Sequence, residues 1–140
     1  MEHVEYLYTF GMDEAELERH LREAETGVLS LARGDDAYAV PVGCHFDGDR
    51  LLLRLAAESG SEKMSFVEDT GRACFVVYEA TTDESRSVLV AGELRATDVE
   101  FDETTINEWF APLRVFDEAI DEVEPVVYEL EMAEVTGRRT

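Results

Sequence analysis

The chain has 140 residues, 45% of them hydrophobic, and its 33 acidic and 12 basic residues give a formal net charge of -21. This length suits one domain with a single core, so we expect residues 1–140 to form one domain. The charge excludes ordinary nucleic-acid binding, which needs cationic side chains to displace counterions from phosphate, and it argues against anionic membrane surfaces. No stretch approaches the ~18 apolar residues of a membrane-spanning helix.

The N-terminal segment and the distribution of charge bear on where the protein works. The segment MEHVEYLYTF lacks a basic stretch followed by an apolar core, so no secretory signal is predicted and a cytoplasmic location is expected. The acidic residues are spread along the chain, and their repulsion is screened only at high salt, where the Debye length is about 3 Å at 1 M. Lys63 is the only lysine. This composition resembles that of halophilic archaeal proteins, the alternative being an acidic mesophilic protein.

Hydrophobic periodicity and turn residues predict six strands and three helices. In chain order they are a helix over 13–25, a strand over 28–33, a hairpin over 37–56, a helix over 62–69, strands over 72–80 and 85–96, a helix over 103–123 broken near Pro112, and a strand over 125–135. Strands outnumber helices and follow one another through short turns. This favours a mainly β fold, an antiparallel sheet or barrel with peripheral helices, over a doubly wound parallel sheet.

Local signals fix several boundaries. Asp13 is a typical N-cap, and Glu16 follows three residues later in a capping-box pattern. Asp47 and Gly48 favour the tight turn of the hairpin. Gly92 lies inside an otherwise continuous strand pattern, which predicts a bulge or a bend of the kind that closes a barrel.

The first strand of the hairpin has one bulky and one small face, because its side chains alternate. The bulky face needs a core and holds Tyr38, Val40, Val42, Cys44 and Phe46. The small face holds Ala37, Ala39, Pro41, Gly43 and His45. A ligand or a second chain could lie close against this small face.

Common catalytic and metal-binding signatures are missing from the sequence. It contains no nucleophile elbow, P-loop, dinucleotide-binding loop or zinc motif. The three histidines, His3, His20 and His45, are too scattered to predict a metal site. Cys44 and Cys74 lie in separate apolar strands and are predicted to be buried free thiols.

The strongest site predicted from the residues themselves is an anion site. Arg54 is a planar double donor on the small face of the hairpin, and Lys63 opens the helix after it. The amides of that helix and Ser61 supply further donors, which suits a phosphate dianion. The open alternative is that both cations only pair with the neighbouring Glu58 and Glu62.

A family resemblance extends this reading. It rests on the segments YAVPVGCHFDGDRLLLRLAAESGSEK, RACFVVYEA, SVLVAGEL and VYELEMAEVTGR. In this order they resemble the pyridoxamine 5'-phosphate oxidase-like split-barrel family, and specifically its small branch related to nitroimidazole-resistance and general-stress flavoproteins. The resemblance implies a six-stranded antiparallel split barrel, a homodimer, and FMN at the subunit interface.

The resemblance also implies which residues hold FMN. Those bordering the isoalloxazine ring through backbone and small side chains would be Val40, Pro41, Val42 and Gly43. Those along the ribityl chain and phosphate would be Arg54, Leu55 and Ala56. Those closing over the phosphate, with Lys63 as the main cation, would be Ser61, Glu62, Lys63 and Met64. Ser87 stands where the family often places a polar group near the ring, and Trp109 would approach the flavin from the second subunit.

Two departures separate this chain from the family members that act on vitamin B6. Those enzymes carry further basic residues on the first hairpin strand, where this chain has Ala39 and Cys44. Their C-terminal arginine motif is not matched by Gly137–Arg138–Arg139. Genuine pyridoxamine phosphate oxidase activity is therefore not expected.

Three functions stay open at this point. The first is an FMN-dependent oxidoreductase acting on a small-molecule substrate, with NAD(P)H as a candidate electron donor and no catalytic residue assigned. The second is a non-catalytic module, a carrier or sensor that binds flavin, deazaflavin or haem. The third is an acidic dimer whose pocket stays empty and whose role is to bind a partner.

Overall fold

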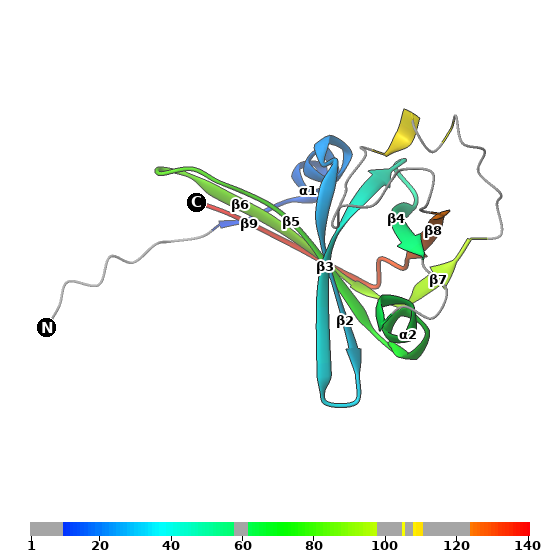
Figure 1. The fold of residues 1–140 in the computed structure, drawn as a ribbon. Helices are drawn as coiled ribbons and strands as arrows, with labels where there is room; N and C mark the ends of the chain where they lie inside the picture. The colour runs from blue at the N-terminus through cyan, green and yellow to red at the C-terminus, as the bar shows by residue number, and fades with distance from the viewer. Residues whose placement is uncertain (1–9, 58–61, 98–104, 106–107, 111–123) are drawn as a thin grey trace, which may run out of the picture.

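A computed structural model describes residues 10–57, 62–97, 105, 108–110 and 124–140. Within these residues, nine strands form one antiparallel sheet that curls into a half-closed barrel, with two helices packed on it (Figure 1). The order of the strands across the sheet is β1-β9-β6-β5-β2-β3-β4-β8-β7. No helix in the described part of the chain is long and apolar enough to cross a membrane.

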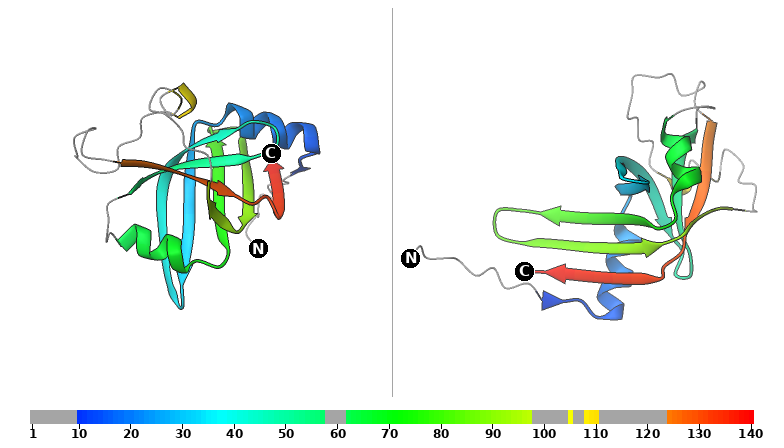
Figure 2. Two further views of the ribbon diagram at one scale, coloured as in Figure 1. Left: turned by 90° about the vertical axis from the view of Figure 1, so that its right-hand side faces the viewer. Right: turned by 90° about the horizontal axis from the view of Figure 1, so that it is seen from below.

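The sheet is built from nine strands and carries two described helices. The strands are β1 (Phe10–Gly11), β2 (Thr26–Arg33), β3 (Asp36–Phe46), β4 (Leu51–Ala57), β5 (Ala73–Ala80), β6 (Ser85–Gly92), β7 (Leu94–Ala96), β8 (Glu124–Leu130) and β9 (Glu134–Arg139). The helices are α1 (Glu14–Glu23), which follows β1, and α2 (Glu62–Asp69), which follows β4. The two helices lie apart from each other on the curled sheet (Figure 2).

The predicted mainly β split barrel is confirmed, and only the strand count differs. The prediction of six strands left out the two-residue β1 and treated two bent strands as continuous. One of these is the pair β6 and β7, whose bend at Gly92 was predicted. The other is the segment 125–135, predicted as one strand, which is wrong because the ladder stops after Leu130 and resumes at Glu134.

The two bends meet at one corner of the sheet. The amide of Glu131 donates a hydrogen bond of 2.8 Å to the carbonyl of Glu93, just after each strand breaks. On one side of the corner β6 pairs with β9, and on the other β7 pairs with β8. Both strands therefore change partners at the same level, and this turns a flat sheet into a curled one.

The core lies inside the curl. Its fully buried side chains include Leu21 of α1 and Phe75 of β5, together with Leu29, Leu51, Leu53, Leu55, Val88, Val90 and Leu130. The alternation predicted for β3 is confirmed, since Val40, Val42, Cys44 and Phe46 are buried while Ala37, Ala39 and Pro41 are exposed. The turn after β3 is also as predicted, because Gly48 has a φ of 103°, a conformation that favours glycine.

Both described helices were predicted. Asp13 caps α1, and its side chain accepts a hydrogen bond of 2.9 Å from the amide of Glu16. The carboxylate of Glu16 accepts a bond from Arg139 in β9, which ties the helix to the sheet. The bounds of α2 agree with the predicted 62–69. Most of the helix predicted over 103–123 lies outside the described residues.

The two cysteines differ in burial. Cys44 is buried as predicted, and its thiol donates to the carbonyl of Ala24 at 3.5 Å. Burial, with the nearby Glu25 carboxylate, raises the pKa of the Cys44 thiol to about 12. Cys74 is only half-buried, so its predicted burial is wrong. Its side chain points away from the core because Ala73 and Phe75 on either side of it point inward.

Candidate functional site

The site is built where β3 and β4 part. Their ladder runs from Phe46 and Leu51 to Gly43 and Arg54 and then stops, whereas β4 stays paired with β8 as far as Ala57. Proline explains the stop. The amide of Cys44 points toward β2, where it donates to Glu25, so the alternate residues Gly43 and Pro41 turn their backbone toward β4. Pro41 has no N–H to donate, and the next bridge cannot form.

A small-residue face surrounds this point on the outside of the sheet. Ala37, Ala39 and Pro41 are exposed, and in register beside them on β2 stand Ala32, Ser30 and Val28. The face continues across β5 and β6 through Cys74, Val76, Tyr78, Ser87 and Leu89, and it ends at the buried Ala91. None of these described outward residues carries a carboxylate, although acidic residues cover the rest of the chain. The small face predicted for β3 is thus part of a larger uncharged surface.

Arg54 is the cation of this surface. It lies half-buried opposite Gly43, on the outward side of β4 between the buried Leu53 and Leu55. Five arginines of the described chain pair with carboxylates, namely Arg50, Arg72, Arg86, Arg95 and Arg139. Among the described residues no carboxylate pairs with Arg54. Its guanidinium is therefore available to an anion lying against Gly43.

The residues predicted to border the flavin ring fall on two sides of the sheet. Pro41 and Gly43 occupy the outward positions of β3 beside Arg54, where Pro41 is exposed and Gly43 is buried. The side chains of Val40 and Val42 are 2% and 3% exposed and belong to the core, as does that of Leu55. These three residues offer a ligand only their backbone, which is one of the two kinds of contact expected between this segment and the ring. Ala56 is paired with Pro125 of β8.

The structure describes only part of the segment that was predicted to close over the phosphate. Glu62 and Lys63 begin α2, and Met64 follows them, half-buried. Ser61 and the side chains of Glu62 and Lys63 lie outside what the structure describes. The meeting of Lys63 with Arg54 at one phosphate therefore stays a prediction.

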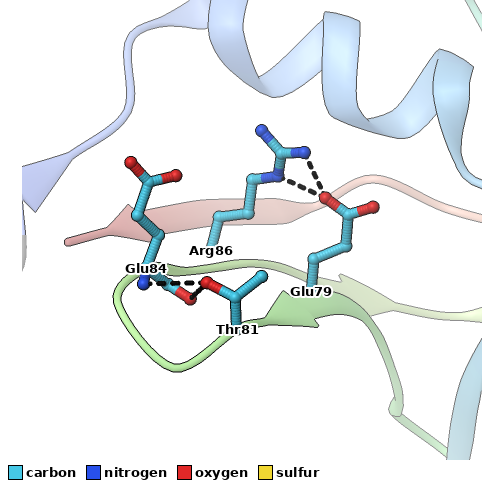
Figure 3. A network of polar contacts seen from close by, with 4 residues as sticks. All are labelled: Glu79, Thr81, Glu84 and Arg86. Atoms are coloured by element: carbon cyan, nitrogen blue, oxygen red, sulfur yellow. Dashed lines mark hydrogen bonds and ion pairs between the residues drawn. The ribbon is translucent and has the colours of Figure 1, made fainter.

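Ser87 lies on the outward face of β6 and is also among the residues that line a hollow at the other end of that face from Arg54. A cavity of about 310 Å³ opens between the end of α1 and the strands β5 and β6, and Ser87, His20 and Thr26 are among the residues that line it. Arg86 of β6 and Glu79 of β5 form an ion pair at this cavity, close to the Thr81–Glu84 turn (Figure 3). Burial, then the positive charges of Arg86 and Arg19, lowers the pKa of His20. Thr26, which lines the cavity, is paired with Gly43, and Gly43 is paired in turn with Arg54.

Trp109 and His45 form a contact that the sequence reading missed. Their rings stack with centroids 4.7 Å apart and 16° between the planes, and Phe110 meets His45 edge-on at 6.3 Å. Trp109 packs against a second apolar cluster, which lies on the outer side of β4 and β8 and contains Leu52, Phe110 and Val127. Trp109 thus covers its own subunit's hairpin. No sequence signal links the two rings, because they come from segments far apart in the chain.

No group of three or more histidine, cysteine, aspartate or glutamate side chains in the described ranges is placed to hold a metal ion. The described site offers a guanidinium, the backbone of β3 and β4 beyond their last pair, and a face of mostly small residues, which together suit an anion and a flat ring system.

Comparisons with known proteins agree with this architecture. A FAD-binding protein from Mesorhizobium loti has 17% identity and a TM-score of 0.72, over 96% of this chain and 99% of that one. A FAD-binding protein from Mycobacterium smegmatis has 16% identity and a TM-score of 0.68, over 94% and 99%. A candidate 5-nitroimidazole antibiotic resistance protein from Bacteroides thetaiotaomicron has 16% identity and a TM-score of 0.68, over 99% and 95%. At these identities the likeness establishes the fold.

Sequence comparison establishes the family. No curated protein sequence matches this chain. The family model described as pyridoxamine 5'-phosphate oxidase matches residues 13–139, which span every strand from β2 to β9 and both helices. The resemblance seen in the sequence is thereby confirmed, and the chain belongs to the pyridoxamine 5'-phosphate oxidase family.

Proposed function

We propose that this protein is an FMN-dependent oxidoreductase that acts on a small-molecule substrate at a flavin held between two copies of the chain. The observation that carries the proposal is the position of Arg54, a cation without a described carboxylate partner, opposite Gly43 and at the edge of a flat uncharged face. A planar ring needs such a face, and a phosphate needs such a cation. Membership of the family and the flavin named for two of the similar structures support the same ligand class.

The chain's own residues would bind and orient the cofactor. Pro41 and Gly43 would lie under the ring. The ring would be bordered by the backbone of Val40, Val42, Leu55 and Ala56. Arg54 and Lys63 would hold the phosphate, together with Ser61 and the first amides of α2. Bound FMN supplies the electron transfer, as cofactors do in such enzymes. NAD(P)H is the proposed donor, and no residue of the described site is assigned as an acid or base.

The outer face of the sheet supports the proposed homodimer. Tyr78 is 67% exposed and Leu89 39%, and both lie on this uncharged face beside Val76. In Figure 2, β5, β6 and β9 extend together beyond the rest of the sheet. A second copy would cover these apolar side chains and could enclose the flavin, which one copy alone would leave open on one side.

A spectrum and a titration test the proposal. Purified protein is expected to carry flavin absorption or to take up one FMN per chain, to sediment as a dimer, and to pass electrons from NAD(P)H to an added acceptor. Bound flavin without turnover would instead support the carrier or sensor. A deazaflavin or haem spectrum would replace FMN as the cofactor, and protein that neither takes up nor is stabilised by any flavin would overturn the proposal.

A further inference from the structure

The rings of His45 and Trp109 lie next to the proposed flavin site. His45 follows Gly43 by two residues on the same outward face of β3, which places their Cα atoms roughly 7 Å apart along the strand. On β4 the same step leads from Arg54 to Leu52, which is fully buried under the Trp109 cluster. The small-residue face therefore ends at the aromatic rings of His45 and Trp109, and His45 is the first of these along β3.

The packing holds the imidazole in place. One ring face stacks on Trp109 at 4.7 Å and the edge of Phe110 approaches at 6.3 Å. His45 nevertheless stays half-exposed, so part of the ring remains open to a ligand. Trp109 and Phe110 are fixed in turn by Leu52 and Val127, which are 0% and 6% exposed. An aromatic side chain held by a packed cluster is a prepared contact surface, since little rotational freedom is lost on binding.

We propose that His45, held by Trp109, is the end wall of the site and contacts the flavin ring rather than the phosphate. The inference rests on the proposed function, and it adds a ring-contacting residue with its supporting partner. Because the anion would be held at Arg54, the contact at His45 selects for a planar heteroaromatic system. Removing it should weaken every ligand that carries the ring, whether or not that ligand has a phosphate.

The test compares FMN with riboflavin, which has the same ring and no phosphate. His45→Ala is expected to weaken the binding of both ligands by a similar factor, about threefold to tenfold as for a lost aromatic pair. His45→Phe keeps a flat ring against Trp109 and should bind both ligands nearly as wild type does. Arg54→Gln should weaken FMN only, and serves as the matched control for a phosphate contact.

Further measurements distinguish a failure of the role proposed for His45 from a variant that does not fold and from a failure of the flavin proposal itself. The fluorescence of Trp109, the only tryptophan, and the urea midpoint of the ligand-free protein report whether each variant keeps its packing. Where His45→Ala unfolds, His45→Gln replaces it, because the amide keeps the size of the side chain without its ring. If the folded variant binds riboflavin as tightly as wild type does, or loses affinity for FMN only, the role of His45 is overturned and the proposed function still stands. Wild-type protein that binds neither ligand would overturn the proposed function with it.

Discussion

Gly92 packs directly against the backbone of Glu131, so closely that a Cβ atom at Gly92 would overlap the Glu131 carbonyl oxygen. The contact lies at the corner where β6 passes into β7 and β8 into β9. Because the obstacle is backbone rather than a side-chain tip, it cannot rotate away. The corner therefore needs glycine for its space, and the curl of the sheet depends on it.

Gly92→Ala is expected to lower the free energy of unfolding by about 1–3 kcal/mol, the usual cost of overpacking. Urea denaturation followed by far-UV circular dichroism measures the change. Gly71→Ala is the matched control, since a Cβ there meets nothing within 4 Å, and it should leave the midpoint almost unchanged. Equal midpoints for the two variants would show that the corner tolerates a side chain.

Arg54→Gln is expected to weaken FMN binding by roughly tenfold or more while leaving riboflavin binding within about twofold. The reason is that a charge-assisted hydrogen bond to phosphate contributes about 1.5–3 kcal/mol and riboflavin has no phosphate. Flavin fluorescence titration measures both affinities. Lys63→Glu should show the same pattern if its ammonium joins the phosphate site.

The control for this prediction is Arg19→Gln. Arg19 is exposed on α1, which packs on the core side of the sheet through Leu21, so this variant removes the same charge away from the outward face of β3 and β4. Its FMN affinity should match that of wild type. A similar loss in both variants would mean that only the overall charge matters, and the proposed phosphate position would be abandoned.

The buried thiol of Cys44 gives the folded state a dependence on alkaline pH. On folding, the pKa of the Cys44 thiol rises from its ordinary value of 9.0 to about 12, mainly through burial. Below pH 9 both states keep the proton, so there is no effect. Between about pH 9 and 12 the unfolded chain loses the proton while the folded chain keeps it. The free energy of unfolding therefore falls as the pH rises through this range.

Cys44→Ala should remove that part of the decline. The free energies of unfolding of wild type and variant are measured from pH 8 to 11. They are expected to converge as the pH rises, because only the wild type loses stability through the buried thiol of Cys44. The half-buried Cys74 is present in both proteins and cancels in the comparison. Two parallel stability curves would contradict the burial of a neutral thiol at position 44.

Salt is expected to stabilise the protein, which is the direct test of a halophilic character. The charge of -21 repels itself, and the described ion pairs, such as Arg72–Glu134 and Arg95–Glu131, are exposed and contribute little each. The urea midpoint should rise between 0.1 and 1 M KCl and then level off as the Debye length reaches about 3 Å. A midpoint independent of KCl would remove the halophilic interpretation.

Much of the fold was readable from the sequence because its signals are local. Alternation assigned both faces of β3, Asp47 and Gly48 placed the hairpin turn, Asp13 placed the start of α1, and Gly92 marked a bend. Each of these depends on a residue and its near neighbours. The continuous strand predicted over 125–135 failed for the opposite reason, since the break after Leu130 lies against Glu93, a residue between β6 and β7 that is distant in the chain.

The sequence by itself determined that this chain is a mainly β barrel with one small-residue face, and that Arg54 lies on that face. The tertiary structure alone decided that Pro41 ends the ladder beside Arg54 and that the side chains of Val40, Val42 and Leu55 belong to the core. It also decided that Trp109 stacks on His45. The physical reason is range: periodicity fixes which way a side chain points, but which distant segment meets it depends on how the whole sheet curls.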